Sequence, residues 1–171
     1  FYDLKVDGRL RLRTSKIVDC SEFGTNNAKG KKSSCLLTWK RRLPENKVGN
    51  IRHEEEIECT IDPDDSEKIE QILSRVLKCP RISSYERIRH NFDSKCSKIT
   101  LDEFPFGLML EFELKNDCLE DDLILEIESC GLKLNDASNM SCDDKYFDLC
   151  RLKDMEPKSD ILFSDLNMPK V

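Results

Sequence analysis

"LMLEFEL", residues 108–114, is an apolar run that contains two glutamates. Glu111 and Glu113 stand at alternate positions, and the positions that alternate with them are apolar: Leu108, Leu110, Phe112 and Leu114. Because successive side chains of a strand point to opposite faces, the pattern predicts a strand with one apolar face and one face that carries two carboxylates. The pattern of the other predicted strands indicates which side chains lie near these two carboxylates.

Five further stretches predict strands with the same two-faced pattern: residues 9–16, 35–41, 51–61, 82–92 and 97–104. One face of each is largely apolar, as in Leu10 and Leu12 of the first. The other faces carry cations at Arg9, Arg11, Arg13, Lys40, Arg52, Arg87 and Arg89, and anions at Glu54, Glu56, Glu58 and Asp102.

Three helices are predicted between and after these strands. The first begins at Asp62-Pro63-Asp64 and ends before Pro80, the second covers residues 118–131 with Gly131 as its stop, and the third covers residues 143–153. We expect residues 1–154 to form one domain and residues 155–171 to be a loosely packed tail.

Composition limits the partners of the chain. Charged residues make up 36% of its 171 residues, and the net charge of −6 argues against a general nucleic-acid or membrane surface. The nine cysteines contain no C-x-x-C pair, which predicts reduced thiols in a cytoplasmic protein rather than a zinc site or a disulfide framework. No apolar run is long enough to span a bilayer.

For a single strand, a sandwich with a wet charged face is the simpler interpretation. Taken together, the charged faces favour an α+β fold in which an antiparallel β-barrel turns them inward and helices cover its apolar outside. Arginine forks pair with phosphate oxygens, and paired carboxylates hold hard cations such as Mg²⁺. A tunnel lined by both would suit a polyphosphate chain with its metal.

These residues resemble the CYTH domain, the triphosphate tunnel metalloenzyme family. LRLR (10–13) and LTWK (37–40) are similar to its L-R-[IL]-R and L-T-[YF]-K strands. Arg52, Glu54 and Glu56 resemble its R-x-E-x-E motif, and residues 87–92 its K-x-R-x-x-Y motif with Arg for Lys and Phe for Tyr. Residues 101–113 and KYFDL (145–149) resemble two later motifs, so the likeness covers about residues 1–152. The family's N-terminal E-x-E-x-K strand is missing, and we expect the natural protein to extend upstream.

The resemblance implies a role for each charged residue. Arg11, Arg13, Arg52, Arg87 and Arg89 would bind phosphate, and Lys40 would contact phosphate or assist a water. Glu111 and Glu113 would bind Mg²⁺ or Mn²⁺ with support from Asp102. Glu54 and Glu56 would hold a second metal or orient the water. Arg9 and Glu58 share the charged faces but lie outside the motifs.

The first hypothesis is therefore metal-dependent hydrolysis of a triphosphate, with inorganic triphosphate as the first substrate to test. The alternatives are a class IV adenylyl cyclase that forms cyclic AMP from ATP, and a polyphosphate- or nucleotide-binding module without turnover. The fourth hypothesis is an α+β domain whose charged faces are merely solvated. Barrels of this family can pair as homodimers through their outer faces.

Overall fold

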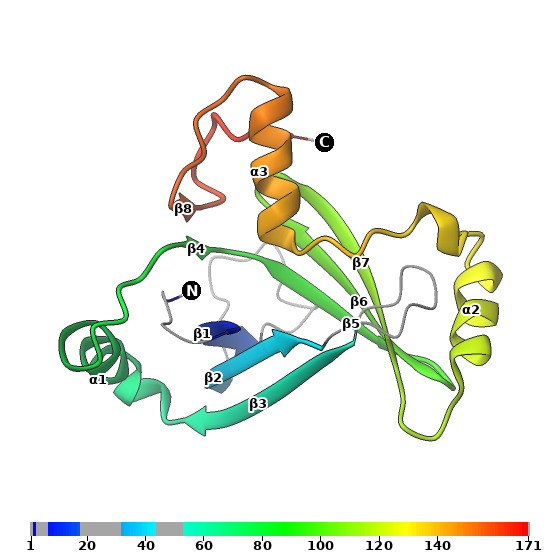
Figure 1. The fold of residues 1–171 in the computed structure, drawn as a ribbon, viewed down its shortest axis with the longest axis horizontal. Coiled ribbons are helices and arrows are strands. Elements are labelled where there is room, and N and C mark those ends of the chain that lie inside the picture. The colour runs from blue at the N-terminus through cyan, green and yellow to red at the C-terminus, as the bar shows by residue number, and fades with distance from the viewer. Residues whose placement is uncertain (1, 3–6, 18–31, 44–52, 171) are drawn as a thin grey trace. The chain divides into compact units, whose positions relative to one another are not determined.

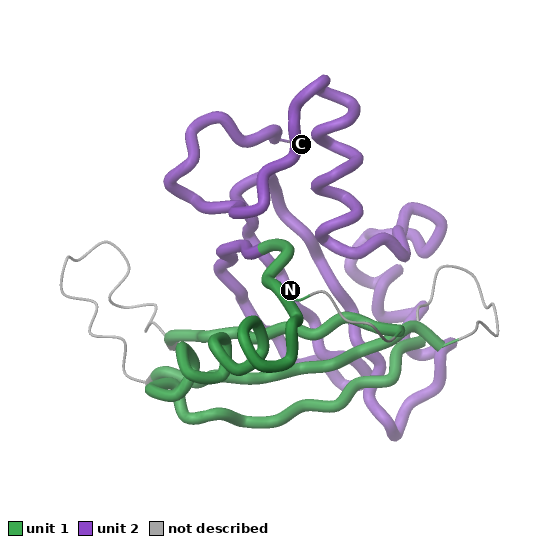
Figure 2. Tube along the Cα trace, turned by 60° about the vertical axis from the view of Figure 1, so that its left-hand side comes forward, with its two compact units in different colours: residues 1–45, 53–83 green, residues 46–52, 84–171 purple. Residues whose placement is uncertain are grey.

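The computed structural model describes residues 2, 7–17, 32–43 and 53–170. The chain divides into two compact units, residues 1–45 with 53–83 and residues 46–52 with 84–171 (Figures 1 and 2). The described residues form three small sheets and three α-helices, so the predicted α+β class is confirmed. None of the described helices is both long and apolar enough to cross a membrane.

The first unit is built on an antiparallel sheet in the order β1-β2-β3, formed by Arg9–Ile17, Lys32–Arg42 and Glu54–Ile61. Trp39 lies opposite Leu10 on one side and Ile57 on the other, so these apolar side chains share one face. Lys40 lies opposite Arg9 and Glu56, which places the predicted charges together on the other face. The predicted alternation of all three strands is therefore confirmed.

A helical segment follows β3. Pro63–Asp65 forms a 3₁₀ turn, Ser66–Gln71 forms α1, and Ile72–Val76 continues as a π-helix. Asp62 caps the segment as predicted, because its carboxylate accepts a hydrogen bond of 3.0 Å from the backbone N–H of Asp64. In this segment Leu73 is buried, whereas Val76 is 69% exposed.

The second unit contains a sheet in the order β5-β6-β7, formed by Ile88–Asp93, Ser97–Phe104 and Gly107–Leu114. Thr100 of β6 lies opposite Asn91 on one side and Glu111 on the other. Ile99 lies between Phe92 and Phe112 in the same way, so the polar and apolar residues separate onto the two faces as predicted.

Residues 82–92 were expected to form one strand, and the structure corrects this. Ser84–Tyr85 forms a separate short strand, β4, which pairs in parallel with β8, Asp160–Ile161. Glu86 continues the ladder by donating its backbone N–H to the carbonyl of Ile161 at 2.9 Å. The chain leaves one sheet at this point and joins the next at Ile88, a break that alternation alone does not reveal.

The C-terminal tail also differs from the loose packing expected of it. Ile161 and Met168 are buried in the same core cluster as Phe104, Phe106 and Tyr146. The hydroxyl oxygen of Tyr146 accepts a hydrogen bond of 3.0 Å from the backbone N–H of Lys158. Apolar burial and a buried phenol thus hold the tail in the second unit.

Two further helices complete this unit. Glu120–Ser129 forms α2, which packs on β7, and Cys142–Leu152 forms α3. Gly131 follows α2 with φ +77°, a left-handed backbone conformation that favours glycine, so the predicted stop is confirmed. Ser141 and Asp144 form a capping box at the start of α3.

The prediction that all cysteines are reduced thiols is wrong for one pair, because Cys96 and Cys118 form a disulfide. The physical reason is the register of the β6–β7 hairpin. Ser97 lies opposite Leu114, so the residues just before β6 and just after β7 come to the same end of the sheet. Sequence spacing alone hides this approach, since 22 positions separate the two cysteines.

Candidate functional site

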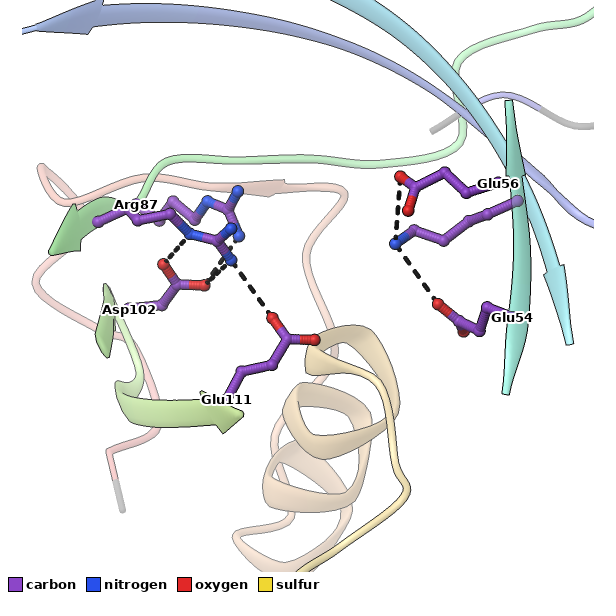
Figure 3. A network of polar contacts seen from close by, with 7 residues as sticks. Glu54, Glu56, Arg87, Asp102 and Glu111 are labelled. Carbon is purple, nitrogen blue, oxygen red and sulfur yellow. Dashed lines mark hydrogen bonds and ion pairs between the residues drawn. The ribbon is translucent and has the colours of Figure 1, made fainter. Parts of the chain in front are cut away.

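The charged face of the first sheet is organised around Lys40. Its ammonium group lies 3.4 Å from a carboxylate oxygen of Glu54 and 3.7 Å from one of Glu56. Arg9 approaches the same Glu54 at 3.8 Å. Cross-strand pairing produces this arrangement, because Lys40 lies directly opposite both Arg9 and Glu56. The right-hand part of Figure 3 draws the bridges of Glu54 and Glu56.

The next row of the same face contains Arg11, Thr38 and Glu58. Thr38 is completely buried, and its hydroxyl donates a hydrogen bond of 3.0 Å to Glu58. The Nε atom of Arg11 is buried and has no hydrogen-bond partner among the described residues. A buried guanidinium N–H without an acceptor is costly, so this atom is a donor suited to an anionic ligand. Arg13 lies two positions further along the same face, opposite Leu36.

The charged face of the second sheet is organised around Asp102, which is only 5% exposed. Its carboxylate accepts hydrogen bonds from Arg87 Nη1 at 2.8 Å and from Arg89 Nε and Nη2 at 2.7 and 2.6 Å. Figure 3 shows Arg87 reaching Asp102 in this network. The carboxylate therefore fixes two guanidinium groups beside each other.

Arg89 is also connected to Glu111 of β7, at 3.5 Å. Burial opposes the charged form of Arg89, but the hydrogen bonds and charge of Asp102, with the charge of Glu111, outweigh it, and the pKa of Arg89 is raised. Glu113 lies one row further, opposite Lys98, and the Glu111 side chain is 54% exposed. The Oγ1 atom of Thr100, in the row of Glu111, is buried without a hydrogen-bond partner among the described residues.

Two sets of side chains among the described residues could hold a metal ion. Among the described residues, the three ligand atoms that lie within 4.8 Å of one another belong to Cys96, Cys118 and Asp122. The carboxylates of β7 do not form such a group in this part of the chain. Glu111 and Glu113 nevertheless present two oxygen donors on one face of a strand. This donor set fits Mg²⁺, which proteins commonly hold by one or two carboxylates together with waters and substrate phosphates.

Eight of the predicted site residues fall into two networks, one in each unit. Arg9, Lys40, Glu54 and Glu56 are brought together in the first, and Arg87, Arg89, Asp102 and Glu111 in the second. Arg52 lies outside the described residues. Thr38, Lys98 and Thr100 were not among the predicted site residues, although strand alternation places each on a charged face.

Comparisons of the chain with protein-family profiles, with curated proteins and with solved structures return no match.

Proposed function

We propose that this protein is a metal-dependent triphosphatase of CYTH type, and that inorganic triphosphate is its substrate. The observation that carries the proposal is the pair of arginines held by buried Asp102. Two guanidinium groups in one fixed orientation are a pre-organised binding element for phosphate oxygens, because their positioning is complete before the ligand arrives.

The first sheet supplies a second phosphate-binding element in this proposal. The buried Nε of Arg11 would donate to a phosphate oxygen, which removes the cost of an unpaired donor. Lys40 adds a positive charge that Glu54 and Glu56 hold on the same face. The antiparallel β-barrel expected from the sequence, with charged faces turned inward, is part of this proposal.

Glu111 and Glu113 would hold Mg²⁺ or Mn²⁺ through their carboxylate oxygens. When bound, the metal would neutralise charge on the phosphate oxygens. Asp102 is better suited to positioning Arg87 and Arg89 than to binding metal directly, because both of its oxygens already accept hydrogen bonds from arginine.

The chemistry left to the chain is positioning and proton transfer. A water attacks the terminal phosphoryl group in line with the leaving oxygen, while the arginines hold the chain of phosphates in place. Glu54 or Glu56 accepts a proton from that water. Lys40, at 3.4 and 3.7 Å from these carboxylates, keeps them on the substrate face and contributes positive charge toward the phosphates.

Phosphate release from tripolyphosphate, thiamine triphosphate and ATP, each with Mg²⁺ or Mn²⁺, tests this proposal. We expect release from tripolyphosphate, and its loss by roughly 100-fold or more in a Glu111→Gln/Glu113→Gln variant, because positioned charge at a transferring phosphoryl group is worth several kcal/mol. Glu103→Gln/Glu128→Gln is the matched control, since it removes two carboxylates outside the charged face and should retain activity.

The other outcomes separate the alternatives. Formation of cyclic AMP from ATP would contradict the hydrolase hypothesis and support a cyclase. Tight metal-dependent binding of tripolyphosphate without phosphate release would support a binding module instead. Equal activity of the two double variants would contradict the assignment of Glu111 and Glu113.

A further inference from the structure

A second candidate metal site lies outside both charged faces. It consists of Cys96 in the β5–β6 turn, Cys118 between β7 and α2, and Asp122 in the first turn of α2. The two sulfurs and a carboxylate oxygen lie within 4.8 Å of one another. The sulfurs are joined as a disulfide in this structure.

The segments that carry these ligands are held together by more than the disulfide. Glu126 of α2 accepts hydrogen bonds from Ser94 Oγ at 2.9 Å, from the backbone N–H of Cys96 at 2.8 Å and from Ser97 Oγ at 2.5 Å. The backbone N–H of Lys115 donates to the carbonyl of Cys96 at 2.9 Å. These contacts would keep Cys96 and Cys118 adjacent after their bond is reduced.

Six further cysteines of the described residues carry free thiols. Cys59 and Cys130 are exposed and carry free thiols, whereas the free thiols of Cys35 and Cys150 are buried. Exposed thiols persist in a reducing environment, where a disulfide is usually transient. A dithiol reductant would attack the Sγ of Cys118, the less buried of the two residues, and leave as its own disulfide with two reduced cysteines behind.

We propose that the reduced pair, together with Asp122, binds Zn²⁺. The ion would displace the two thiol protons and take two thiolates and one carboxylate oxygen, with water as the fourth ligand of a tetrahedral site. Asp122 already accepts the backbone N–H of Leu119 at 2.9 Å, and this hydrogen bond fixes its carboxylate beside the sulfurs. Oxidation of the two thiolates by a disulfide oxidant, which is itself reduced to two thiols, would re-form the Cys96–Cys118 bond and release the ion.

This site is chemically distinct from the oxygen-only site proposed on β7. Thiolate ligands select zinc over magnesium, whereas carboxylates alone suit the harder cation. The inference does not depend on the proposed triphosphatase, because none of its three residues belongs to the charged faces.

Zinc retention by the whole chain tests the inference. The protein is reduced with a phosphine, the reductant is removed, and Zn²⁺ is titrated against a chromogenic chelator. We expect one tightly held Zn²⁺ per reduced chain and none in the oxidised chain. Asp122→Asn should weaken binding about tenfold or more, since even an outer-shell partner contributes that much.

Two matched variants decide where the ion binds. Cys59→Ser/Cys130→Ser removes two exposed thiols elsewhere and should retain the one Zn²⁺. Cys96→Ser/Cys118→Ser should lose it, with far-UV circular dichroism as the check on folding. Co²⁺ loading gives a second readout, a thiolate-to-metal absorption band that Asp122→Asn shifts. Absence of zinc binding by the reduced chain, or full retention by Cys96→Ser/Cys118→Ser, would overturn the inference.

Discussion

At the scale of single residues, Asp102 is the buried carboxylate that holds two arginines in place. It is 5% exposed and accepts three hydrogen bonds from Arg87 and Arg89. A buried carboxylate between two guanidinium groups stabilises the fold only while all three charges are present, because removal of one partner leaves the others buried without compensation.

We therefore expect Asp102→Asn to lower the free energy of unfolding by about 2–3 kcal/mol, somewhat below the range for fully buried pairs because the arginines are partly exposed. Urea unfolding followed by circular dichroism measures this. Asp93→Asn is the control, because Asp93 is 80% exposed in its pair with Lys115 and its loss should cost about 0.5 kcal/mol or less. An equal loss of unfolding free energy in the two variants would contradict the claim that Asp102 stabilises the fold through its two arginines.

At the scale of elements, α2 is fastened to the β5–β6 turn by Glu126. Hydrogen bonds from Ser97, from the backbone of Cys96 and from Ser94, aided by the charge of Lys115, lower the pKa of Glu126 from its ordinary value of 4.5. Because the folded-state pKa is lowered, the stabilisation is present above pH 4.5 and is lost as the pH falls through the folded-state value.

Glu126→Gln should therefore be less stable than the natural sequence at pH 7, and the difference between the two proteins should shrink in acid. Urea unfolding of both proteins at pH 7 and at pH 3 measures that difference. The comparison cancels the acid sensitivity of the other carboxylates, which both proteins share. A difference that stays constant between the two pH values would show that the ionised carboxylate is not what holds the turn.

The same scale shows what the sequence predicts well and what it does not. Alternation placed Glu111 on one face of β7 and Leu110 on the other, because the two-residue period of a strand is fixed by backbone geometry. It did not reveal the break before Ile88, which depends on pairing with Asp160–Ile161, far away in the chain. The disulfide was missed for a similar reason, since it depends on the hairpin register.

At the scale of the whole molecule, each unit carries one sheet with charges of both signs on one face. In each, a cation of one strand is held by two carboxylates from other strands of the same sheet: Lys40 by Glu54 and Glu56, and Arg89 by Asp102 and Glu111. The residues were identifiable from their sequence pattern. The partners of Lys40 and Arg89 depend on strand register, and the lack of a hydrogen-bond partner for the Nε of Arg11 among the described residues depends on burial; only the structure provides both.

We propose that these faces bind a triphosphate with its metal. Calorimetric titration of the chain with tripolyphosphate, with and without Mg²⁺, tests it before any question of turnover. We expect one binding site per chain, with tighter binding in the presence of Mg²⁺. Binding should be weaker in Arg11→Gln and Arg89→Gln by about 1.5–3 kcal/mol, or roughly 10- to 150-fold. An absence of binding with and without Mg²⁺, or binding unchanged in both variants, would contradict it.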